Sequence, residues 1–160
     1  FDITEEVYID PGTYQWWRYR LELATAGKRR LAAKASWWFG GYYDGHLNQV
    51  QLEATWRPSH HVTVALEGET NLVRVSSGDA DILLARARLD FFITPDFQVL
   101  NYVQYDNLSD SIGVNCRLRY TYRSLLDIFL VFNHNWLEID HHYRTDLNQF
   151  LLKVQYSWRR

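Results

Sequence analysis

The sequence is notable first for what it lacks. Among its 160 residues there is no methionine and one cysteine, Cys116. A single cysteine excludes an internal disulfide framework and a zinc site built from cysteines. No run of 18 apolar residues occurs, so no transmembrane helix is expected.

An excess of charge of one sign is also absent. The 17 Lys and Arg residues nearly balance the 19 Asp and Glu residues, which gives a formal net charge of -2. No global field therefore favours nucleic acid or an acidic substrate as a partner. The motifs GxSxG, GxxxxGK[ST] and HExxH are missing as well, so we predict no catalytic residue, metal site or cofactor and no enzyme activity.

Helical periodicity is missing too, and a period-two alternation of apolar and polar residues takes its place. It predicts an all-β fold, an antiparallel up-and-down meander of about nine long strands. The expected strands cover residues 13–25, 29–41, 46–57, 60–73, 79–93, 96–107, 111–122, 126–137 and 146–159. Globular strands average about 5–6 residues and tilted membrane-crossing strands need about 9–11. The lengths therefore favour the wall of a barrel.

Each expected strand has a charged face and an apolar face. The charged residues, named here the lumen set, are Arg18, Arg20, Glu22, Lys34, Glu53, Glu67, Glu69, Arg86, Arg88, Asp90, Arg117, Arg119 and Lys153. In a membrane barrel the charged face lines the lumen, where it selects solutes, holds a plug or forms mutually neutralising cross-strand pairs. In a soluble barrel the apolar face points inward instead. Alternation alone leaves both architectures open.

The connections between the expected strands favour the membrane barrel. The first, third, fifth and seventh links (TAGKR, PSH, TPD, RSLL) are mostly shorter than the even-numbered ones (GGYYDGH, VSSGDA, NLSD, EIDHHYRTD). Outer-membrane barrels have short periplasmic turns and longer outer loops. The first strand would then run toward the periplasm.

Aromatic residues in the apolar rows favour the same interpretation, because they gather at two heights with Leu, Val and Ala between them. The aromatic set consists of Trp17, Tyr19, Trp37 and Phe39 near the outer end and Trp56, Phe91, Tyr120, Tyr122, Tyr156 and Trp158 near the periplasmic end. Two such girdles are typical of membrane-interface anchoring. The last strand alternates up to Trp158 and resembles the C-terminal strand of outer-membrane barrels, although Arg159 and Arg160 follow it. We therefore expect a porin-like protein of the bacterial outer membrane and cell envelope that contacts membrane lipid and lipopolysaccharide.

The strand count predicts that the sequence is part of a larger barrel. Single-chain bacterial barrels have an even number of strands, whereas about nine are expected here. We expect residues 1–12 to form an outer loop or linker and residues 13–160 to form a barrel segment, with further strands upstream of Phe1. The visible sequence has no signal peptide, which agrees with a processed or excised segment.

Several stretches together carry a family resemblance. They are IDPGTYQWW at 9–17, LEATWRPSHHVTVALEGETN at 52–71, the run from Ala87 to Arg123, and LLDIFLVFNHN at 125–135. They resemble the C-terminal part of an uncharacterised bacterial family, in which a carbohydrate-binding family-nine-like domain precedes an outer-membrane barrel. The resemblance implies such an upstream domain as a partner within the same chain, and it implies no catalytic residue.

Three further groups of side chains are weak candidates for sites. Four loop histidines, His60, His61, His141 and His142, would need more ligands to hold a metal. The loop from Asp106 to Asp110 offers oxygen ligands for calcium, although an ordinary polar turn explains it better. His134 interrupts an apolar row near the outer rim, where a barrel hydrolase would need a serine partner.

The sequence thus leaves three hypotheses for function. The first is an integral outer-membrane barrel that serves as a structural anchor and solute channel. The second is a soluble β-barrel that binds an apolar ligand, and the third is a barrel-embedded hydrolase. Solubility without detergent discriminates the first two.

Overall fold

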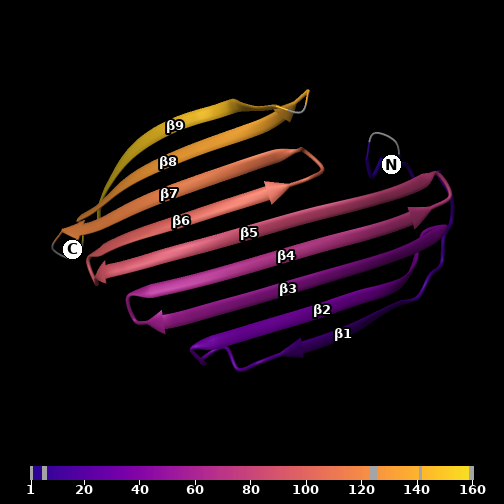
Figure 1. The fold of residues 1–160 in the computed structure, drawn as a ribbon, viewed down its shortest axis with the longest axis horizontal. Coiled ribbons are helices and arrows are strands. Elements are labelled where there is room, and N and C mark those ends of the chain that lie inside the picture. Colours follow the sequence, from indigo (N-terminus) through magenta and orange to yellow (C-terminus); the bar gives the residue numbers. More distant parts are fainter. Residues whose placement is uncertain (1, 5–6, 123–125, 141, 159–160) are drawn as a thin grey trace.

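A computed structural model describes residues 2–4, 7–122, 126–140 and 142–158. In these ranges the chain has no helix and forms one nine-stranded sheet (Figure 1). The strands are β1 (Arg18–Ala24), β2 (Leu31–Tyr42), β3 (Gly45–Ser59), β4 (Val62–Val75), β5 (Gly78–Thr94), β6 (Phe97–Asp106), β7 (Ser111–Tyr122), β8 (Leu126–Ile139) and β9 (His142–Tyr156). Their order in the sheet follows the chain, and each pair of neighbours is antiparallel. The predicted all-β meander is confirmed.

The first and last strands differ most from the predicted ranges. β1 begins at Arg18 rather than Thr13, and the Pro11-Gly12 pair just before that stretch is typical of turns. β9 begins four residues early, at His142. There the register shifts, because Asn135 pairs with Leu147 while Trp136 pairs with Thr145. The resulting β-bulge lets β9 continue past Asp146, which the alternation alone did not predict.

The predicted difference in link length is wrong for the described links. Residues 25–30, 60–61 and 95–96 connect strands at one end of the sheet, and residues 43–44, 76–77 and 107–110 do so at the other. We call these the His60 end and the Tyr43 end. Two-residue links occur at both ends, since β3, β4 and β5 extend into stretches that the sequence suggested were loops.

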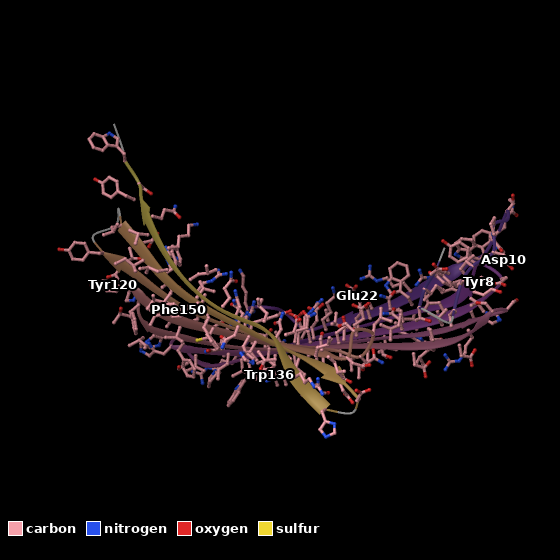
Figure 2. The ribbon with its side chains drawn as sticks, turned by 90° about the horizontal axis from the view of Figure 1, so that it is seen from above. Tyr8, Asp10, Glu22, Tyr120, Trp136 and Phe150 are labelled. Atoms are coloured by element: carbon pink, nitrogen blue, oxygen red, sulfur yellow. The ribbon has the colours of Figure 1, made fainter. Side chains whose placement is uncertain are left out.

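The sheet is bent into a trough whose two faces differ in chemistry. In Figure 2 Glu22 lies on the concave side, whereas Tyr120 and Trp136 lie on the convex side. Ser36 on the concave face is 3% exposed, while its chain neighbour Trp37 on the convex face is 43% exposed. Strand pairing preserves the alternation across the sheet, so the lumen set shares the concave face and the long aliphatic and aromatic rows share the convex face. The separation is incomplete, because Leu84, Leu100 and Val131 also lie on the concave face.

The sheet is not closed by the described residues. β1 pairs with β2 alone and β9 pairs with β8 alone, so both are edge strands. Side chains of β9 are exposed along its whole length. The structure thus gives one continuous wall with two free edges.

The N-terminal residues form a small packed unit on the concave face at the Tyr43 end. Val7 and Ile9 are only 3% and 4% exposed, and Val7 packs with Leu47, Val73 and Ala80. The Ser77 hydroxyl accepts a hydrogen bond from the Tyr8 amide (3.0 Å) and donates one to the Tyr8 carbonyl (2.5 Å). The stretch predicted as an outer loop or linker thus includes residues docked against β3, β4 and β5.

Candidate functional site

Every member of the lumen set lies on the concave face. The pairing register places Glu53 opposite Lys34 and Glu67, and Glu67 opposite Arg86. Ion pairs link Arg86 with Glu67 (3.7 Å), Arg88 with Asp90 (3.3 Å), Lys34 with Glu22 (3.8 Å) and Arg20 with Glu22. Most of these charges thus have an opposite charge beside them, as in a mutually neutralised wall.

Glu69 is held by amides rather than by a cation alone. Its carboxylate accepts hydrogen bonds from Gln49 Nε2 (2.8 Å), Gln51 Nε2 (3.2 Å) and Asn71 Nδ2 (3.1 Å). Ser36 also joins this network by donating to Gln51 Oε1 (3.1 Å). Three donors on two neighbouring strands fix the carboxylate in one position, so it is a rigid feature of the concave face.

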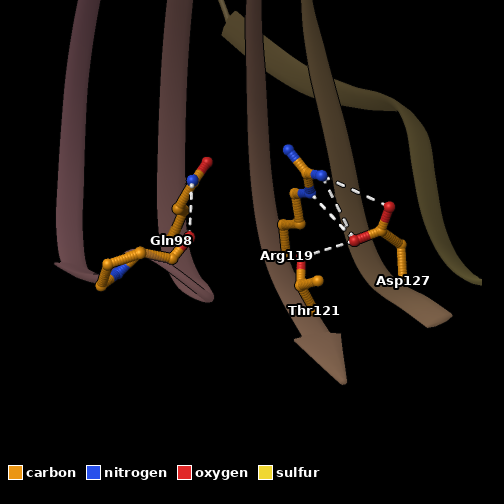
Figure 3. Close-up of polar contacts among 5 residues, drawn as sticks. Gln98, Arg119, Thr121 and Asp127 are labelled. Atoms are coloured by element: carbon orange, nitrogen blue, oxygen red, sulfur yellow. Dashed lines mark hydrogen bonds and ion pairs between the residues drawn. The ribbon is translucent and has the colours of Figure 1, made fainter. Parts of the chain in front are cut away.

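Two concave contacts involve residues that the sequence did not single out. Arg18 and Arg20 lie 5.3 and 4.9 Å from the ring centroid of Trp38. Near the His60 end, Arg119 lies 3.3 Å from both carboxylate oxygens of Asp127, which also accepts a hydrogen bond from Thr121 (2.5 Å) (Figure 3). The three missed residues, Trp38, Thr121 and Asp127, occupy positions in phase with the lumen set, which is the signal that could have identified them.

Five neutral amides, Gln104, Asn115, Asn133, Asn135 and Gln149, lie together on the concave face of β6 to β9, toward the Tyr43 end. A groove of 350 Å³ lies here, and we call it the amide groove. Its lining residues are Tyr102, Gln104, Ser111, Gly113, Val114, Asn115, Asn133, Asn135 and Leu147. No charged side chain is among them, in contrast to the concave face of β1 to β5.

The convex face carries the aromatic set. Its members within strands share this face, whereas Trp17 and Trp158 lie outside the strands and are 81% and 79% exposed. Ring contacts join Tyr19 to Phe39 (5.7 Å between centroids) at one end, and Phe97 to Tyr120 (6.4 Å) at the other. Sequence reasoning missed Tyr105 and Trp136, which extend the convex aromatics at the Tyr43 end to β6 and β8.

Between the aromatics the convex face has an apolar depression of 880 Å³. Small side chains form its floor, among them Ala33, Ala54, Ala85 and Ala87, together with Gly68. Larger aliphatic side chains such as Leu52 and Leu66 border it and are 56% and 55% exposed. The depression is open and lies on the outside of the curve rather than within it.

His134 and Asn101 interrupt the convex apolar rows, as the sequence predicts. The His134 ring contacts Phe132 (6.0 Å between centroids) and Trp136 (4.1 Å). Among the described residues its Nε2 has no hydrogen-bond partner. Asn101 donates to the Leu89 carbonyl (2.9 Å). Neither residue forms a nucleophile–base pair with a described serine.

The loop candidates make ordinary structural contacts. His61 Nδ1 lies 2.6 Å from the Phe92 carbonyl and His142 Nδ1 lies 2.8 Å from the Asp140 carbonyl; His141 lies outside the described residues. Asn107 receives a hydrogen bond from the Leu83 amide (2.6 Å) and donates to the Asp81 carbonyl (2.9 Å). Within the described ranges, no three His, Cys, Asp or Glu side chains are grouped to hold a metal ion.

No family model, curated protein or solved structure matches this chain. In the part of the chain that the structure describes, no helix has the length and apolar character to cross a membrane.

Proposed function

We propose that this chain is part of the wall of a transmembrane β-barrel in the bacterial outer membrane, with lipid against its convex face and solute along its concave face. The protein would act as a structural anchor and a solute channel. Membrane lipid and lipopolysaccharide would be its partners on the convex side.

The observation that carries this proposal is the direction of curvature relative to the two faces. A soluble barrel closes around its apolar side chains, whereas a membrane barrel turns them outward and its polar side chains inward. In this sheet the lumen set occupies the concave side, and Leu21, Leu52 and Leu66, which the register places on the opposite side, are 55–58% exposed. Water would meet this wide apolar surface at a high free-energy cost, while lipid would not.

The same geometry bears on the alternatives. A soluble barrel that binds an apolar ligand would enclose an apolar cavity, but the apolar depression lies on the convex side. Acyl chains would fill it in a bilayer. A barrel-embedded hydrolase finds support neither in the contacts of His134 nor in a described catalytic group.

Solubility tests the proposal. The purified full-length protein should need detergent or lipid to stay monodisperse, and its circular dichroism should be rich in β-structure. Sedimentation of the protein with and without detergent measures its aggregation state in the two buffers. A monodisperse monomer in plain buffer would overturn the membrane assignment and favour the soluble barrel.

A further inference from the structure

The amide groove differs from the rest of the concave face in its hydrogen-bonding chemistry. Two adjacent cross-strand rows form it, Tyr102–Asn115–Asn133–Gln149 and Gln104–Gly113–Asn135–Leu147. In the first row Asn115 donates to Asn133, and Asn133 Nδ2 donates to Gln149 Oε1 (3.3 Å). Each amide carries two donor hydrogens and an acceptor oxygen. The chain of hydrogen bonds therefore orients these amides and uses only part of their capacity.

Neighbouring contacts also leave capacity for a ligand. The Tyr102 hydroxyl donates to Gln104 Oε1 (2.8 Å), which leaves both hydrogens of Gln104 Nε2 to donate elsewhere. Leu147 and the Tyr102 ring add apolar surface beside the amides. The groove thus combines oriented donors and acceptors with an apolar wall, the combination typical of small-molecule sites.

Two arginines of β5 that flank the groove, Arg86 and Arg88, lie beside carboxylates. Arg88 is the cross-strand partner of Tyr102, and Arg86 is the partner of Gln104. Arg88 lies 3.3 Å from Asp90 and Arg86 lies 3.7 Å from Glu67. The cations at these two positions therefore face carboxylates of the wall, and the residues that line the groove itself carry no charge.

The groove is open at Gly113 because this residue has no side chain. A Cβ atom at this position would lie 3.1 Å from Asn135 Oδ1, so a larger side chain would fill the gap between Gln104 and Asn135. The volume of 350 Å³ falls within the range of about 300–1,000 Å³ for ligand pockets. Gly68 on the convex face can serve as a control position, because a Cβ atom there would have no neighbour within 4 Å.

We propose that the amide groove binds a neutral polyhydroxylated solute of the oligosaccharide class. Hydroxyl groups both donate and accept hydrogen bonds, which matches oriented amides better than a single charge would. The carbon-bound hydrogens of a sugar ring match the apolar wall beside them. The inference rests on the proposed function, in which the concave face is the solute path, and it names the class of solute.

The test is calorimetric titration of the full-length protein with maltohexaose, cellohexaose, hexaglycine and hexagalacturonate. At least one neutral hexaose should bind. Gly113→Leu should weaken that binding at least tenfold, and Gly68→Leu should leave it within twofold. Asn115→Asp, which keeps the size of the side chain but removes its donor to Asn133, should weaken binding as well. Heat-modifiable migration on gels checks that each variant is folded.

Three results would overturn the assignment of the groove as a sugar-binding site. Binding of neither hexaose, stronger binding of hexagalacturonate or hexaglycine, or equal affinity in Gly113→Leu and the parent protein would do so. Detergent dependence is measured separately. A detergent-requiring protein that binds no hexaose would refute the groove alone, whereas a soluble protein that binds one through Gly113 would refute the membrane assignment alone.

Discussion

Gln51 and Leu52 are neighbours in β3, yet their side chains meet opposite environments. Gln51 hydrogen-bonds to Glu69 on the concave face, whereas Leu52 is 56% exposed on the convex face. Alternate direction along a strand is a consequence of backbone geometry. The face on which a side chain lies is therefore set by its position in the alternation along the strand rather than by its polarity.

Arginine substitution at two such positions should have unequal costs. Ala85→Arg would place a cation on the lipid face, at a cost of about 2–4 kcal/mol near the bilayer midplane. Gln51→Arg should cost much less, because the new cation would lie beside Glu69 in a polar environment. Denaturant-induced unfolding of both variants in lipid vesicles measures the difference. Equal costs would show that the two faces are wrongly assigned.

At the scale of elements, the docked N-terminal residues are the least expected feature. Val7 is 3% exposed, whereas the next residue, Tyr8, is 51% exposed. Gly78, against which Val7 packs, has a φ of 155°, a conformation that favours glycine. The β4–β5 hairpin and the N-terminal residues are thus fitted to each other.

Val7→Asp should release the N-terminal residues, since it would bury an unpaired carboxylate among Leu47, Val73 and Ala80. Limited proteolysis should then cut within residues 1–12 faster than in the parent protein, with β2 to β8 still resistant. Tyr8→Asp is the matched control, because the same charge at an exposed position leaves the packing in place. Similar cleavage rates for the two variants would contradict the docking.

The sequence predicted the strands well because one physical signal, the alternation, governs them. The expected range 111–122 matches β7 at both ends, and 126–137 stops two residues short of the end of β8 at Ile139. Val7 and Ile9 were missed because two apolar residues among acidic ones carry no periodic signal. The amide groove was missed for another reason: Asn and Gln alternate like other polar residues, and only the cross-strand register brings them together.

At the scale of the whole molecule, the two free edges limit how the wall can close. Eight antiparallel pairings separate β1 from β9, so the two strands run in the same direction. Direct closure would make a parallel pair, whereas bacterial single-chain barrels are antiparallel throughout. A second copy in the same membrane orientation would meet the same obstacle. We therefore expect an odd number of further strands between β9 and β1.

Hydrogen exchange of the full-length protein in detergent tests this expectation. In hydrocarbon an unsatisfied backbone group costs several kcal/mol, so both edges of β1 should be paired. Successive amides in Arg18–Ala24 should then all exchange slowly. Fast exchange at every second amide would indicate an open edge and contradict closure by further strands.

The most direct test of the central claim is lipid contact at adjacent residues of β3. In a Cys116→Ser background, a fluorophore attached to Leu52→Cys should be quenched when the full-length protein is reconstituted into vesicles of brominated lipid. The same fluorophore at Gln51→Cys should keep its emission, because it would point into the concave side. Quenching at position 51 and not at 52, or equal quenching at both, would contradict the assignment of lipid to the convex face.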